Sequence, residues 1–126
     1  GTNNAIIPAE APAAPVAHGL YRDNICKGWA QVSVSGGTPT LNADYNVTSI
    51  TDSGVGELTV TWETDFTSAN YALLPGGQGP AGSDHSIFAI DADNNPATGS
   101  CRLTCATGGN VLQDPQKWTF VAYGVQ

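Results

Sequence analysis

The sequence predicts an all-β domain, a small antiparallel β-sandwich of about seven strands that follows an extended N-terminal arm. Short segments in which apolar and polar residues alternate recur from Trp29 onward, and clusters of Gly, Pro, Asn and Asp separate them. No segment combines helical periodicity with helix caps. A chain of 126 residues fits one domain, so we assign residues 25–126 to the sandwich and residues 1–24 to the arm.

The N-terminal block, residues 1–24, is rich in Ala and Pro, and its prolines exclude a regular helix and favour an extended chain. Two interpretations remain open: a flexible linker, or an ordered arm on a neighbouring subunit. The second makes Ile6, Ile7 and Val16 subunit contacts, because these apolar side chains would otherwise face water. Since the chain begins with Gly and has no Met, we expect a processed product or a piece of a longer protein.

Seven segments have the composition and alternation of strands. They are residues 29–34, 45–51, 56–63, 71–74, 85–91, 101–105 and 117–123. The clearest alternation places Leu58 and Trp62 on one face of the third segment, as in a half-buried antiparallel strand. Trp62 and, by its own alternation, Trp118 are therefore expected in the core, whereas the position of Trp29 stays undecided.

Turn signals separate these segments. Residues 36–39 (GGTP) are expected to end the first strand. Residues 51–54 are expected to form a turn, within a hairpin over residues 51–56 whose glycines accept positive φ. Residues 76–83 contain Gly-X-Y triplets that are too few for a triple helix, so we expect a mobile, protruding loop there.

The charge balance excludes two classes of partner. Only 12% of the residues are charged, and the net charge is −7 with 4 Lys and Arg in total. So few cations cannot neutralise a nucleic-acid backbone or bind an anionic membrane surface. Nucleic acid binding is therefore not expected. No apolar run is long enough for a transmembrane helix, so membrane insertion is not expected either.

The three cysteines are expected to be free thiols. If Cys101 and Cys105 lie on one strand, their Cα atoms are about 13 Å apart, well beyond the roughly 7 Å that a disulfide tolerates. Free thiols fit assembly in a reducing cytoplasm. A zinc site lacks the usual pairs of closely spaced cysteines.

Catalytic motifs are incomplete, and we expect neither an enzyme nor a cofactor. Ser83, Asp84 and His85 are adjacent, but adjacent side chains of an extended chain point to opposite faces and cannot form a relay. The GxGxxG match at residues 77–82 contains Pro80 and lacks the following helix that phosphate binding needs.

A weak calcium candidate follows the fifth predicted strand. Asp91, Asp93 and Asn95 occupy the first, third and fifth positions of a calcium loop. The sixth position, which should be Gly, is Pro96, and the twelfth, which should be Glu, is Arg102. A polar turn is therefore the main interpretation, with no metal as the expected state.

Several segments together resemble a module that recurs in virion proteins of tailed phages and prophages. They are residues 27–29 (KGW), 45–60 (YNVTSITDSGVGELTV), 69–72 (ANYA) and, more loosely, 120–124 (FVAYG). The resemblance implies a tail fibre or other virion structural protein, commonly trimeric, and brings no catalytic residues. The chain departs from the family pattern at residues 76–83 and 91–109, where surface loops would lie.

The function expected from these observations is the distal receptor-binding domain of a tail fibre, in a bacteriophage virion assembled in the bacterial cytoplasm. Its loops would contact a glycan or protein of the host surface, and a homotrimer would cover exposed strand edges. The candidate receptor-binding residues are Gln78, Ser83, Asp84, His85, Asn94 and Asn95.

Two alternatives remain open. A capsid decoration or head-fibre protein would use residues 1–24 to hold the capsid shell. A non-catalytic carbohydrate-binding module would display a Trp on a flat surface strip, whereas three buried Trp residues would argue against it.

Overall fold

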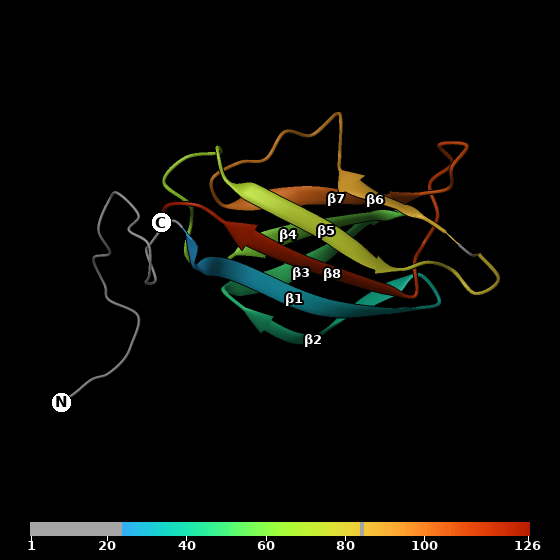
Figure 1. Ribbon diagram of the computed structural model, residues 1–126. Helices are drawn as coiled ribbons and strands as arrows, with labels where there is room; N and C mark the ends of the chain where they lie inside the picture. Colours follow the sequence, from blue (N-terminus) through green and yellow to red (C-terminus); the bar gives the residue numbers. More distant parts are fainter. Residues whose placement is uncertain (1–23, 84) are drawn as a thin grey trace.

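The computed structural model describes residues 24–83 and 85–126, which form an all-β sandwich. Its strands are β1 (Cys26–Ser35), β2 (Thr38–Tyr45), β3 (Val47–Gly54), β4 (Glu57–Trp62), β5 (Ala72–Gln78), β6 (Ile87–Ile90), β7 (Ser100–Ala106) and β8 (Lys117–Tyr123). The predicted fold class is confirmed (Figure 1). The predicted subunit contacts Ile6, Ile7 and Val16, and the receptor candidate Asp84, lie outside the described residues.

The strands form two antiparallel sheets of four. Sheet I has the order β2-β1-β8-β5, and sheet II has the order β3-β4-β7-β6. The chain makes one hairpin in each sheet, crosses to β5 at the edge of sheet I, returns to β6 and β7, and ends with β8 between β1 and β5. The last strand thus joins both halves of sheet I, and the two sheets lie over one another in Figure 1.

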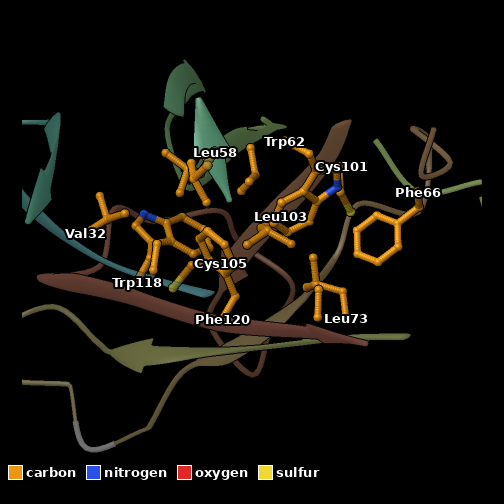
Figure 2. Packing of buried hydrophobic residues seen from close by; sticks show 14 residues of the cluster. Val32, Leu58, Trp62, Phe66, Leu73, Cys101, Leu103, Cys105, Trp118 and Phe120 are labelled. Carbon is orange, nitrogen blue, oxygen red and sulfur yellow. The ribbon is translucent and has the colours of Figure 1, made fainter. Parts of the chain in front are cut away.

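The core lies between the sheets and is built from the alternate residues that face inward (Figure 2). On β4, Leu58, Val60 and Trp62 are at most 2% exposed, and Trp118 on β8 is equally buried. The predictions for Trp62 and Trp118 are therefore confirmed. Trp29 is 40% exposed, because it alternates with inward-facing neighbours on β1 and so faces away from the core.

The first strand does end before residues 36–39, as predicted, since β1 ends at Ser35. The expected number of strands is one too low because no strand was assigned to residues 38–44. Gly36 and Gly37 form the turn into β2, which begins at Thr38, pairs with β1 only and is therefore an edge strand. An edge strand tolerates Pro39, since proline cannot donate a ladder hydrogen bond. Because β2 is mostly exposed, it lacks the apolar alternation by which the other strands are recognised.

The loop predicted at residues 76–83 begins later than expected. Gly76, Gly77 and Gln78 continue β5 and pair with β8 as far as Lys117. Glycines are poor strand formers, but Gly77 is needed here for close packing. A Cβ at Gly77 would lie 2.1 Å from the Lys117 carbonyl oxygen and 2.8 Å from the Phe88 ring.

The hairpin predicted over residues 51–56 is present, but the turn predicted at residues 51–54 is wrong, because these residues belong to β3 and pair with β4. Gly54 pairs with Glu57, so Val55 and Gly56 connect β3 to β4. Gly54 and Gly56 both have positive φ.

No helix in residues 24–83 or 85–126 has the length and hydrophobicity needed to cross a membrane.

Candidate functional site

The structure divides the predicted receptor-binding residues into two groups. Gln78, Ser83 and His85 lie where β5 ends and β6 begins. Asn94 and Asn95 lie beyond the other end of β6, beside Thr59 and Arg102 on the outer surface of sheet II. All five predicted residues are exposed, but the length of β6, roughly 13 Å at strand rise, separates the two groups.

The β5–β6 loop is held by its own hydrogen bonds. The Ser83 backbone N–H donates to the Pro80 carbonyl (3.0 Å), and the Ser83 hydroxyl donates to the backbone carbonyl of His85 (2.9 Å). The hydroxyl thus contacts the His85 backbone, and this contact does not activate it as a nucleophile.

The calcium candidate is organised as a turn around Asp91. Its carboxylate accepts hydrogen bonds from the Asp93 backbone N–H (2.9 Å) and the Asn94 side-chain amide (2.8 Å), and it lies 3.9 Å from Arg102 Nη1. Asp93 and Asn95 are exposed to solvent. In the described part of the chain, no group of three or more His, Cys, Asp or Glu side chains is placed to hold a metal ion. This geometry supports the interpretation of residues 91–95 as a polar turn.

EDTA is expected to leave the melting temperature unchanged, and millimolar calcium is expected not to raise it. A calcium ion would have to displace the amide donors and the guanidinium that already face Asp91. Differential scanning calorimetry with and without EDTA checks this. A fall in melting temperature that calcium reverses would instead establish a metal site at residues 91–95.

A part-buried polar contact holds the β4–β5 connection against sheet II. Trp62 Nε1 donates to the Tyr71 hydroxyl (3.3 Å), which itself donates to the carbonyl oxygen of Ala97 (3.0 Å) or Ser100 (3.1 Å). Burial raises the pKa of Tyr71 to about 12 and the pKa of the Cys101 thiol to about 11. Both groups are therefore held neutral, which suits a structural role. All three cysteines are free, as the sequence predicts.

The free energy of unfolding is expected to fall as the pH rises from 9 towards 12. The folded pKa values of Cys101 and Tyr71 lie above their ordinary values of 9.0 and 10.0, so folding favours the neutral forms. That contribution is complete below the unfolded pKa values and is lost as the pH passes the folded ones. Urea unfolding between pH 8 and 11.5 checks this. In a Tyr71→Phe variant the free energy of unfolding should fall less steeply with pH. An equally steep fall in the variant and the unmodified chain would exclude Tyr71 as a source of the pH dependence.

The outer surfaces of the two sheets differ in chemistry. The outward residues at the centre of sheet II are polar: Glu57, Thr59, Thr61, Arg102 and Thr104. The outer surface of sheet I has a row of apolar side chains, one from each strand, which are cross-strand partners. This apolar row consists of Tyr45 on β2, Trp29 on β1, Val121 on β8 and Leu74 on β5.

An open depression lies beside the apolar row. In the next register position, Gln31 on β1, Thr119 on β8 and Gly76 on β5 are neighbours. Because Gly76 has no side chain, the surface is hollowed there to a volume of about 470 Å³, with Trp29 and Leu74 among its walls. Nine residues line the depression, and none of them is charged.

This surface is the candidate functional site, and the sequence-based predictions missed it. The alternation of Ala30 and Val32 with Trp29 and Gln31 could have placed Trp29 on an outer face. The cross-strand row could not be read from the sequence, because it needs the register of four strands. Gly76 was missed because its glycine-rich surroundings indicated a loop.

Comparison of the chain with protein-family models, with curated proteins and with solved structures found no match.

Proposed function

We propose that the chain is a non-catalytic structural module of a tailed-phage virion and serves as the distal receptor-binding domain of a tail fibre. The observation that carries the proposal is the place of the resembling segments in the fold. Residues 27–29 lie in β1, residues 45–60 run from the end of β2 through the β3–β4 hairpin, and residues 69–72 lead into β5. Segments far apart in the chain thus contribute to both sheets of one sandwich, as expected of a recurring module.

The buried reactive groups support a binding role. Burial raises the pKa of the Cys101 and Cys105 thiols, and Tyr71 is held neutral in the same way. A thiol in its neutral form is a poor nucleophile. The exposed surface instead offers hydroxyls, amides and the apolar row, which are groups that recognise a ligand without transforming it.

We expect the full chain to be a homotrimer. The edge strands β2 and β5 of sheet I, and β3 and β6 of sheet II, are hydrogen-bonded on one side only within the described residues. Such edges are covered in stable proteins, and symmetric packing of three copies is one way to do so. Light scattering in dilute buffer should give three times the mass of one chain, and a strict monomer would contradict the trimer.

The receptor-binding role is tested by adsorption. The purified full chain should bind host cells and reduce adsorption of the phage that carries it, because it occupies the same receptor. A variant lacking residues 1–24 should still bind cells. Binding of the full chain to virus particles but not to cells would overturn the proposal and favour the capsid decoration protein, whose arm would hold the shell.

The exposure of Trp29 favours one second candidate, a carbohydrate-binding module from a bacterial secreted enzyme or adhesin. A Trp that is 40% exposed on the outer surface of a sheet is what such a module would display. Electron microscopy with an antibody to the chain separates the two candidates. Labelling of phage tails supports the virion module, and labelling confined to the bacterial surface or medium supports the second candidate.

A further inference from the structure

We infer that the depression beside the apolar row on the outer surface of sheet I is a binding site for a neutral saccharide. The inference rests on the proposed function of a receptor-binding module and names the chemical class of the receptor. It places the contact on a sheet surface, away from the loop residues that the sequence indicates.

The walls and floor of the depression suit a sugar ring. Trp29 is 40% exposed and Leu74 is 62% exposed, and they stand on strands that lie on either side of β8. A pyranose has an apolar face of C–H groups and a rim of hydroxyls, so an exposed aromatic ring is a suitable partner for that face. Gly76 leaves the space between the walls unfilled, because any side chain there would project beside Thr119.

Two polar side chains in the depression can bind hydroxyls. Gln31 and Thr119 are cross-strand partners and are both exposed on the outer surface. The Gln31 side-chain oxygen accepts a hydrogen bond from the Asn42 amide at 3.5 Å, and Gln31 is among the residues that line the depression. An amide and a hydroxyl supply both donors and acceptors, as hydroxyl-rich ligands require.

The electrostatics favour a neutral ligand. None of the nine lining residues is charged, and the chain has a net charge of −7. An anionic sugar such as a uronic acid would meet a repulsive field with no guanidinium or ammonium partner in the depression. A neutral hexose or N-acetylhexosamine meets no such cost.

The size of the depression suits a small ligand. Its volume of about 470 Å³ lies within the range of roughly 300–1,000 Å³ that is usual for ligand sites.

The test uses the full chain on an immobilised array of neutral and uronic-acid-containing bacterial oligosaccharides. At least one neutral probe should bind, and the acidic probes should not. Trp29→Ala should weaken that binding at least tenfold. The control Leu112→Ala removes a side chain of equal exposure, 41%, from the β7–β8 loop and should leave binding unchanged.

A filling variant keeps the test independent of Trp29. Gly76→Val adds a side chain whose Cβ would lie 3.4 Å from the Thr119 hydroxyl, an ordinary contact, and valine suits a strand. The variant should fold and yet lose saccharide binding at least tenfold. The matched control Gly108→Val adds the same side chain where nothing lies within 4 Å, and it should bind as the unmodified chain does.

The outcomes separate this inference from the proposed function. If Trp29→Ala and Gly76→Val still compete with the phage for host cells, the inference is overturned and the receptor-binding function stands. If the unmodified chain itself fails to bind cells, the proposed function fails. If neither variant binds less saccharide but both lose the oligomer in light scattering, the surface is a subunit contact and the inference is overturned.

Discussion

Replacing Trp62 with Ala is expected to lower the free energy of unfolding by about 3–5 kcal/mol, the usual cost of removing a large aromatic side chain from a core. Trp62 packs edge-on against Phe66, Tyr71 and Phe120, with ring centroids 5.5, 6.0 and 6.0 Å away. The backbone of Gly28 lies against the same ring, since a Cβ there would be 2.6 Å from Trp62 Cζ3. The side chain therefore joins β1, β4 and β8 with the β4–β5 connection, and its loss leaves a cavity that the rigid strands cannot close.

Urea unfolding followed by circular dichroism measures this loss. Trp29→Ala is the matched control, because it removes the same side chain from the outer surface of sheet I, where Trp29 is 40% exposed. Trp29→Ala should lower the free energy of unfolding by less than half as much as Trp62→Ala does. Equal losses in the two variants would contradict the assignment of Trp62 to the centre of the core.

The Gly56→Ala variant is expected to be destabilised by about 3 kcal/mol, from backbone strain of roughly 1–2 kcal/mol and overpacking of similar size. Gly56 has a φ of +69°, which a residue with a Cβ adopts only at a cost. A Cβ there would lie 2.6 Å from the Cys105 carbonyl oxygen and 2.7 Å from the Gln113 backbone nitrogen. Both neighbours are backbone atoms, so neither can rotate away.

Gly36→Ala separates the strain from the overpacking. Gly36 has a φ of +57° in the β1–β2 turn, and nothing lies within 4 Å of its absent Cβ. This control should therefore lose only the strain, about 1–2 kcal/mol. The difference between the two midpoints in urea reports the close packing of the β3–β4 turn against residues 105 and 113. No difference would show that this packing is looser than the structure indicates.

The parts of the fold that could be predicted are those where one face of a strand is buried and the other meets water. On β4, Leu58 and Trp62 alternate with threonines because the inner face packs on sheet I and the outer face is solvated. The same period of two indicated β8. The edge strand β2 escaped prediction because little of it is buried, and the C-terminal half of β5 escaped because its glycines satisfy a packing need that only the neighbouring β8 and Phe88 impose.

The candidate site could be predicted only in part, because it depends on register. Trp29 and Leu74 are 45 positions apart in the chain. They line the same depression only because each of them pairs with Val121 on β8. Loop residues such as Ser83 and Asn94 were identified because they are polar and follow turn signals. Polarity and exposure do not bring them together, and the structure places them at the two ends of β6.

Amide chemical-shift mapping of the full chain, with the neutral oligosaccharide that binds in the array, locates the surface that the saccharide contacts. Saccharide bound to the outer surface of sheet I should perturb the amides of residues 29–31, 74, 76 and 119–121, and leave those of sheet II unchanged. Perturbation confined to residues 79–86 or to residues 91–99 would place the contact in the loops and exclude the outer surface of sheet I as the binding site.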